Sequence, residues 1–377
     1  MKSLPLVIAV VLVALQCDRP EPVPDQPGIT LSKAMGAVKG ENFDRALKPQ
    51  AFTFPLDHGP HPSFRTEWWY LTGNLTTKEG NNFGYQFTVF RTALTREHAQ
   101  RASPWASNQI YMAHFTVTDV DGNEFYYDER FSRDGSRLAG AQANPFRVWL
   151  EDWEVRQSEP AVAYDLPVLR VQARTESAGI DLVLRALKPF VLQGESGLSQ
   201  KGPEIGDASY YYSYTRLGTE GTITVNGKDW AVNGNSWMDR EWSTSVLSAD
   251  QIGWDWFALQ LDDNTELMYY QMRKKGGAPD LFSKGVLVRE DGSKSPLTKD
   301  DVILTVADKW VSPSGTVYPS RWQLSVPGKG IDFAVIPTLR NQLLDVSIDY
   351  WEGSVTIEGA RNGAKLVGRG YVELTGY

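Results

Sequence analysis

Apolar and polar residues alternate along most of the chain from about Phe54 onward, in short runs separated by turn residues. The runs are rich in aromatic and β-branched residues, and each is closed by Gly, Asn or Asp. An alternation of period two, repeated every ten residues or roughly so, predicts antiparallel strands joined by tight turns. The pattern therefore predicts an all-β protein, either a barrel or a sandwich. The clearest expected strands are 69–75, 85–91, 113–119, 124–131, 222–227, 256–263 and 266–273.

Two segments of the chain are echoed later in the sequence. Residues 67–91 read as a Trp-rich strand, a turn and a strand that ends in Arg, and 253–273 repeat this order. Residues 221–242 begin with a Gly-led strand and close with an acid and an aromatic residue, as do 353–377. The same two motifs thus open and close each half, which is typical of two tandem domains. Chance similarity among aromatic strands is the alternative.

The length of the chain agrees with two domains. A chain of 377 residues exceeds what one ordinary core supports. We place the boundary near Ser243–Gln251, so that residues 51–246 form an N-terminal barrel and 247–377 a C-terminal barrel. The helical periodicity that would argue for another fold class is weak throughout.

The N-terminus predicts export. Lys2 precedes an apolar run of about a dozen residues, too short for an ordinary membrane span, so residues 1–17 are expected to be a signal peptide. Cys17 follows this run and is the only cysteine, as in bacterial lipoproteins, although Gln16 departs from the small residue usual before the acylated cysteine. We expect a periplasm-facing protein anchored to the membrane by a lipid on Cys17, or otherwise a soluble periplasmic or secreted one. Residues 18–50 are expected to form an extended tether and a weakly helical or irregular lead-in.

Composition narrows the choice of partners. The chain contains 13 Trp, 16 Tyr and 15 Phe, which favours strands and a cavity lined by rings. Its formal net charge is −8, and it has no basic run that could follow a phosphate backbone, so nucleic acid is not expected as a partner.

Three segments are more polar than strands require: 55–70, 112–119 and 235–243. His58 and His61 have the spacing of a metal-ligand pair, and His114 could be a third ligand. No cysteine assists them, and the intervening Gly-Pro reads as a turn, so no metal site is expected. A serine nucleophile is not expected either, because the G-x-S-x-G motif is absent.

Acid–base chemistry is the better candidate. Asp239 and Glu241 are two residues apart, so on a strand they share a face, with Arg240 on the other. If the acidic face points into an apolar cavity, burial raises the pKa of at least one carboxyl and makes it an acid able to protonate an alkene. In the opposite orientation Arg240 pairs with Glu67 inside the barrel and the acids face solvent. Alternation alone does not decide between these.

Tryptophans flank the polar motifs. In one interpretation they fill the barrel ends and form the interface between the barrels. In the other they line an apolar cavity and stabilise positive charge on a substrate. The six concerned are Trp68, Trp69, Trp237, Trp242, Trp254 and Trp256.

Six segments in order resemble the AttH-like family of bacterial exported proteins, which is related to carotenoid 1,2-hydratases and more distantly to fungal decalin-forming Diels–Alderases. The segments are PLDHGPHPSFRTEWWYLTGNL, AHFTVTD, YYYSYTRL, NSWMDREWS, GWDWFALQLDD and ELTGY. The resemblance implies two tandem lipocalin-like antiparallel barrels, with a hydrophobic cavity in the N-terminal half or at their junction. For the hydratases it also implies cofactor-independent addition of water to a double bond, started by an acidic group. Asp239 matches the aspartate of the hydratase His-Asp pair, whereas Met238 replaces the histidine.

Three functions are therefore open. The first is a carrier of a small hydrophobic molecule, such as an isoprenoid or lipid, and the second a hydratase, isomerase or cyclase that needs no cofactor, with Asp239 and Glu241 as its catalytic groups. The third is a structural or assembly lipoprotein. Candidate ligand-binding residues are His58, Glu67, Trp69, Arg91, His114, Tyr212, Trp237 and Trp242.

Overall fold

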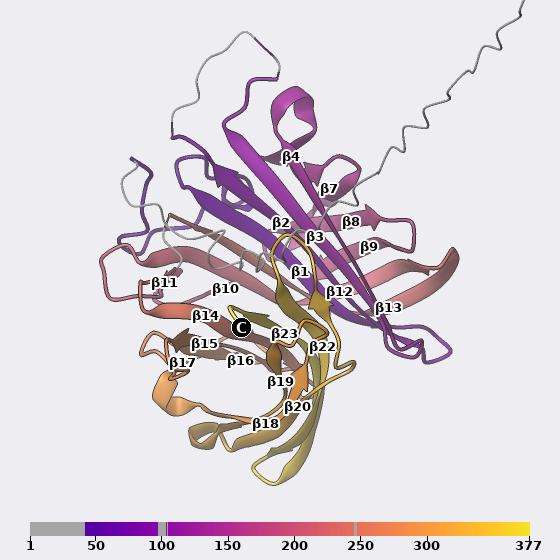
Figure 1. The fold of residues 1–377 in the computed structure, drawn as a ribbon, viewed down its shortest axis with the longest axis vertical. Helices are drawn as coiled ribbons and strands as arrows, with labels where there is room; N and C mark the ends of the chain where they lie inside the picture. Colours follow the sequence, from indigo (N-terminus) through magenta and orange to yellow (C-terminus); the bar gives the residue numbers. More distant parts are fainter. Residues whose placement is uncertain (1–41, 97–102, 104, 245–246) are drawn as a thin grey trace, which may run out of the picture.

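The structure, a computed structural model, describes residues 42–96, 103, 105–244 and 247–377, almost entirely as antiparallel strands and turns (Figure 1). The expected signal peptide, Cys17 and most of the expected tether lie outside the described residues. The described part of the lead-in, 42–50, contains no helix. No helix in the described part of the chain combines the length and apolarity needed to cross a membrane.

Within the described residues, the first 13 strands form one antiparallel sheet in the order β4-β3-β2-β1-β13-β12-β9-β8-β7-β6-β5, with β10 and β11 paired to β12. The sheet curls so that β4 comes into contact with β5 and β6, close to a barrel. Its elements are η1 (Leu56–His58), β1 (Thr66–Thr76), β2 (Asn82–Ala93), β3 (Gln109–Asp119), β4 (Glu124–Arg133), η2 (Gly135–Arg137), β5 (Ala139–Ala143), β6 (Phe146–Leu150), β7 (Trp153–Ala163), β8 (Leu166–Arg174), β9 (Ala178–Ala186), β10 (Val191–Leu192), β11 (Leu198–Gln200), β12 (Ala208–Val225) and β13 (Lys228–Ser243).

The remaining strands form a second, 10-stranded sheet within the described residues, in the order β17-β16-β15-β14-β23-β22-β20-β19-β18, with β21 paired to β22. In Figure 1 this orange-to-yellow sheet lies below the indigo-to-magenta one. Its elements are β14 (Gln251–Leu261), β15 (Glu266–Lys274), β16 (Lys284–Val288), β17 (Lys294–Thr298), η3 (Lys299–Asp301), β18 (Ile303–Val311), β19 (Val317–Val326), η4 (Pro327–Lys329), β20 (Ile331–Pro337), β21 (Leu343–Leu344), β22 (Tyr350–Arg361) and β23 (Ala364–Thr375).

The predicted fold class is confirmed. The last strand of the first sheet ends at Ser243 and the first strand of the second begins at Gln251. In each half the last strand returns to pair with the first: β13 with β1, and β23 with β14. The turn residues follow the expected chemistry, because Asn362 and Gly363 both adopt positive φ in the hairpin between β22 and β23.

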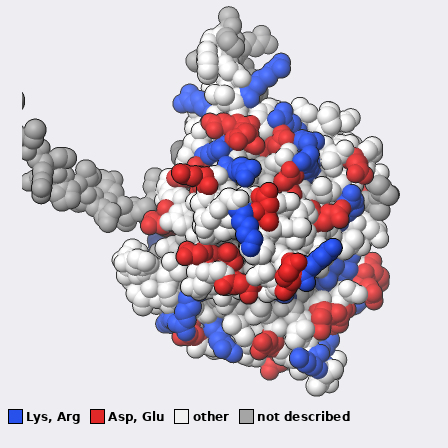
Figure 2. All heavy atoms as spheres, turned by 90° about the vertical axis from the view of Figure 1, so that its right-hand side faces the viewer, with Lys and Arg blue, Asp and Glu red and all other residues white. Residues whose placement is uncertain are grey.

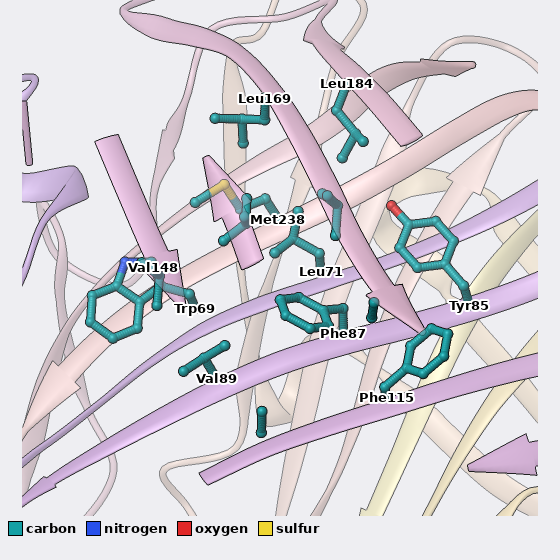
Figure 3. Packing of buried hydrophobic residues seen from close by; sticks show 14 of the residues in the cluster. Trp69, Leu71, Tyr85, Phe87, Val89, Phe115, Val148, Leu169, Leu184 and Met238 are labelled. Atoms are coloured by element: carbon teal, nitrogen blue, oxygen red, sulfur yellow. The ribbon is translucent and has the colours of Figure 1, made fainter. Parts of the chain in front are cut away.

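Each barrel has its own apolar core. In the first barrel Trp69, Leu71 and Met238 point inward among side chains from β2, β3, β6, β8 and β9 (Figure 3). In the second barrel, Phe257, Trp322 and Trp351 belong to an equivalent core. On the surface, basic and acidic side chains are intermingled over the face shown in Figure 2, without a broad area of one sign.

The two barrels pack against each other along their first and last strands and the strands beside these. β1 contacts β23, β2 contacts β22 and β12 contacts β14. Asn74 on β1 donates a hydrogen bond to the carbonyl of Gly370 (3.0 Å) and accepts one from Ser354 (2.6 Å). A third apolar cluster contains side chains of both sheets, including Tyr70 and Trp256. The junction is therefore a packed interior, and polar groups within it are shielded from water.

Candidate functional site

The direction of the side chains on β13 settles the question that the sequence leaves open. Met238 lies in the core of the first barrel, and so does Trp242. Arg240 is on the same face and ion-pairs with Glu67. Asp239 therefore points out of the first barrel, but into the junction with the second one rather than into solvent. Each of the two sequence-based alternatives is half correct: Arg240 makes the structural ion pair, and the acids still face an enclosed site.

Asp239 and Glu241 line a pocket at this junction. The pocket has a cavity volume of about 60 Å³, and about 620 Å³ of empty space when the open solvent at its mouth is counted. Both barrels contribute to its wall, and rings make up much of it. The lining residues are Trp68, Tyr70, Phe90, Lys201, Tyr211, Asp239, Glu241, Trp254, Trp256, Tyr270, Met272 and Glu373.

Asp239 is a buried carboxyl with three neutral hydrogen-bond donors. Its Oδ1 accepts from Ser213 (2.5 Å) and from the indole of Trp237 (2.7 Å), and its Oδ2 accepts from Tyr211 (2.6 Å). Burial raises the pKa of Asp239 more than these donors lower it, and the result is about 7. Near neutral pH this group is therefore poised to give or take a proton.

Glu373 lies on the opposite side of the pocket, on β23. Its Oε1 accepts a hydrogen bond from Trp254 (2.6 Å). Burial raises its pKa to about 7, although hydrogen bonds from Trp254 and Glu352 oppose that rise. Glu352 stands directly opposite Glu373 on β22, fully buried, and burial together with the neighbouring charge raises its pKa far above the ordinary range. Two carboxyls in contact without a cation cannot both be ionised, so this pair retains a proton at neutral pH.

Glu241 differs from the other pocket acids because it has a cation for a partner. Lys201 forms a salt bridge with it. The same ammonium lies 5.5 Å from the ring centroid of Trp68 and 5.7 Å from that of Tyr211, within the range of cation–π attraction. The aromatic wall thus already accommodates one positive charge, and Glu241 is a counter-ion for Lys201 rather than a free acid.

The opposite face of β13 belongs to a buried ionic cluster in the first barrel. Glu67 is fully buried and ion-pairs with both Arg91 and Arg240. Burial raises the pKa of Glu67, but the two guanidinium groups more than offset this, so that its pKa lies well below the usual range. Arg240 lies 4.0 Å from the ring centroid of Trp69, and His61 stacks on Trp242 at 3.8 Å. These contacts fix the position of the strand that carries Asp239.

The candidate ligand-binding residues of the first barrel lie away from the pocket. His58 is fully buried between Tyr212, 2.7 Å from its Nδ1, and the carbonyl of Asp165, 2.8 Å from its Nε2. Burial lowers its pKa to about 4, so it is neutral. Trp69 donates its indole N–H to the carbonyl of His58 (2.8 Å). Alternation along β13 places Arg240, and not Asp239, against this segment, with its guanidinium over the ring of Trp69.

His114 and Trp237 complete the candidate set. His114 is buried on β3, with its Nδ1 2.7 Å from the hydroxyl of Tyr350 in the second barrel. It contributes to the junction but not to the pocket wall. Trp237 does not line the pocket either. Its indole N–H donates a hydrogen bond to Oδ1 of Asp239. Among the described residues, no three His, Cys, Asp or Glu side chains are grouped as metal ligands would be.

The internal echo relates six of the pocket residues, of which three are tryptophans already expected to line a cavity and three were not predicted. Aligning 67–91 with 253–273 equates Trp68 with Trp254, Tyr70 with Trp256 and Phe90 with Met272, and all six line the pocket. Pairing registers extend the equivalence: Asp239 is opposite Tyr70, and Glu373 is opposite Trp256. The internal repeat therefore predicts Glu373 as the counterpart of Asp239, but only once the pairing register of the strands is known.

The raised pKa values predict how stability depends on pH. Between the ordinary carboxyl pKa of about 4 and the folded value near 7, the folded state binds more protons than the unfolded state. We therefore expect the free energy of unfolding to fall as pH rises from about 5 to 8, by a few kcal/mol for each such group at most. Urea unfolding at a series of pH values measures this. Asp239→Asn is expected to flatten part of the slope, and a slope identical to that of the original protein would contradict the prediction.

Comparison with known proteins places the chain in context. A sequence model described as AttH-like matches residues 45–377. The crystal structure of an AttH protein from Nitrosomonas europaea is 34% identical, with a TM-score of 0.77, covering 89% of this chain and 100% of that one.

Two more distant structures share the fold. Kievitone hydratase from Nectria haematococca is 18% identical with a TM-score of 0.64, covering 90% of this chain and 98% of that one. The structure of CghA with Sch210972 is 12% identical with a TM-score of 0.52, at the same coverages. A search of curated proteins found no match.

Proposed function

The chain belongs to the AttH-like family, and from that premise we propose that it is an acid catalyst acting on an alkene within an apolar molecule. The reaction is hydration, isomerisation or cyclisation without a cofactor, and it takes place in the pocket between the barrels. Asp239 donates the proton that starts it.

The environment of Asp239 carries this proposal. A carboxyl that is buried and has a pKa of about 7 is still partly protonated at neutral pH. Once it has given up its proton, the hydrogen bonds from Ser213, Tyr211 and Trp237 stabilise the carboxylate that remains. The group thus combines an available proton with a supported conjugate base, which is what general acid catalysis needs.

The aromatic wall supports the same chemistry. Protonation of an alkene leaves a positive charge on carbon, and the faces of indole and phenol rings attract such a charge. Trp68 and Tyr211 already lie near the ammonium of Lys201, and Tyr70 packs edge-on against Trp256 at 5.1 Å. An alkene that gives a tertiary cation, as isoprenoid double bonds do, fits this wall best.

The fold neighbours are compatible with the proposal. One of them is a hydratase and another holds an organic compound, and both share the two-barrel architecture. At their identities to this chain the likeness concerns the fold, so the reaction rests on the pocket itself.

Isotope incorporation tests the proposal with a panel of alkenes in place of one chosen substrate. The protein is incubated in deuterated water with para-prenylphenol, citronellol and squalene, which carry trisubstituted double bonds on different tails. We expect deuterium at the alkene carbons of at least one compound, detected by mass spectrometry, with a rate that falls above pH 7 as Asp239 loses its proton. Heat-denatured protein is the control. Absence of incorporation across the panel at pH 6 to 8 would count against the proposal.

A carrier is the second candidate, because the same aromatic lining would hold an apolar molecule without reacting. The two functions separate in the same experiment. A carrier retains a lipid or isoprenoid through purification and leaves its double bonds free of deuterium.

Residues 1–17 and Cys17 support a location for either function. We propose that the protein is exported and attached by a lipid at Cys17 to a membrane facing the periplasm. Such a position would place the pocket beside a reservoir of apolar molecules. Mass spectrometry of the mature N-terminus, compared with a Cys17→Ser variant, tests this.

A further inference from the structure

We propose that Glu373 is a second catalytic residue of this pocket, the general base that takes the proton from the attacking water, and that Glu352 is its positioning residue. This inference rests on the proposed function and narrows it to hydration. The two acids then stand on opposite walls, Asp239 from the first barrel and Glu373 from the second.

The first support is a difference between equivalent positions in the two halves. Ser213 is opposite Asp239 in the register of β12 and β13, and Glu352 is opposite Glu373 in that of β22 and β23. The first barrel thus gives its acid a hydroxyl donor, whereas the second barrel gives its acid another carboxyl. A carboxyl can donate a hydrogen bond only when it is protonated, so Glu352 must carry a proton to support Glu373.

The second support is the set of partners around this pair. Tyr70 donates a hydrogen bond to Oε1 of Glu352 (2.6 Å), and Oε2 of Glu352 is buried without a partner other than its neighbouring carboxyl. Glu373 receives the indole N–H of Trp254. Glu352 has no place on the pocket wall and Glu373 does. Glu352 is therefore the member that keeps the proton, and Glu373 is the carboxylate that faces the ligand.

The proposed step balances in atoms and charge. Asp239 transfers its proton to one alkene carbon, and the other carbon becomes a cation. A water oxygen forms a bond to that carbon, and one water proton passes to the carboxylate of Glu373. The product is an alcohol, and the enzyme holds an ionised Asp239 and a protonated Glu373. Proton exchange through solvent at the pocket mouth restores the starting state.

The test separates protonation from water addition. The protein and its Glu373→Gln variant are each incubated with the alkene panel in deuterated water and in water labelled with heavy oxygen. Deuterium in the recovered alkene reports reversible protonation by Asp239, and heavy oxygen in the product reports water addition. We expect Glu373→Gln to lower oxygen incorporation at least about a hundredfold while deuterium incorporation persists. The exposed Glu358→Gln on β22 is the matched control.

Each result has a distinct meaning. Equal loss of both labels in Glu373→Gln, or no loss of either, would overturn the role of Glu373 as the base and leave the proposed function standing. Deuterium without heavy oxygen in the unmodified protein would overturn hydration but not acid catalysis. The absence of both labels in the unmodified protein would overturn the proposed function and this inference together.

Glu352 is tested by conservative rescue. Glu352→Gln keeps an N–H donor toward Glu373, so oxygen incorporation is expected to persist. Glu352→Leu removes the donor, which raises the pKa of Glu373 and moves the acidic limb of the pH–rate profile to higher pH. A purely structural role would lower the rate at every pH without moving the acidic limb.

Infrared spectroscopy locates the proton independently of turnover. A protonated-carboxyl band should be lost in Glu352→Gln but not in Glu358→Gln. Persistence of the band in Glu352→Gln would overturn the assignment of the proton to Glu352.

Discussion

Asp239→Asn is expected to lower deuterium incorporation into a reactive alkene by about 10²- to 10⁴-fold or more, because it removes the proton donor. The amide has nearly the shape of the carboxyl, and its oxygen can still accept from Ser213 and Trp237. The fold and the apolar wall should therefore survive. Quenching of pocket tryptophan fluorescence by para-prenylphenol is expected to be unchanged, so that the loss falls on the rate and not on binding.

The matched control for this variant lies on the same strand. Asp229 is exposed near the start of β13, and Asp229→Asn changes the same chemical group outside the pocket. It should leave the rate unchanged. Full activity in Asp239→Asn would remove Asp239 from the acid role. Lost quenching together with lost activity would instead show that the asparagine disturbs the pocket.

Glu67→Gln is expected to have the largest effect on stability, costing about 3–5 kcal/mol. The substitution leaves the guanidinium groups of Arg91 and Arg240 buried and without their counter-charge. Because the pKa of Glu67 is held low, its contribution is present throughout the range above the unfolded value near 4.3, and it is lost only as pH falls below that value. The deficit should therefore be constant from pH 5 to 8. Urea unfolding measures it.

Two comparisons complete the Glu67 experiment. Glu124→Gln, at the exposed start of β4, removes a carboxylate without a buried partner and should change stability by less than about 0.5 kcal/mol. Removing Arg91 in the background of Glu67→Gln should cost less than removing it alone, because the two side chains interact directly. A cost of Glu67→Gln below about 1 kcal/mol would contradict the prediction and mean that water reaches the cluster.

Most of the fold could be predicted from the sequence, because half-buried strands show an alternation that is visible without their partners. The expected strand 69–75 lies within β1, and 113–119 lies within β3. The run 222–227 is less well predicted, since Asn226 and Gly227 form the turn after β12 and both have positive φ. The order of strands in the sheets could not be predicted from the sequence, because it depends on contacts between residues far apart in the chain.

The site was only partly predictable, for a reason visible on β13. Period-two alternation places Asp239 and Glu241 on one face, but it does not say which face is buried where both are. Here Arg240 points into the core of the first barrel and Asp239 into the pocket between the barrels, and both side chains are buried. His58 and Glu67 are polar residues in apolar surroundings, a pattern that a functional site also shows. Their partners in the first barrel account for that polarity. Glu373 was visible only as the acid that closes the second repeat, and its place in the pocket depends on the strand register.

The equivalence of the two halves has a consequence for how such a pocket could arise. A single-barrel ancestor that dimerised through its closing strands would have placed the same acid on both walls, with identical surroundings and therefore identical affinity for protons. In such an assembly the two acids differ only by which of them holds a proton at a given moment, because their surroundings are the same. Joining the copies into one gene removes that restriction, and positions 213 and 352 now hold a serine and a glutamate. Fusion of the halves would thus be the event that allowed donor and acceptor of the proton to diverge.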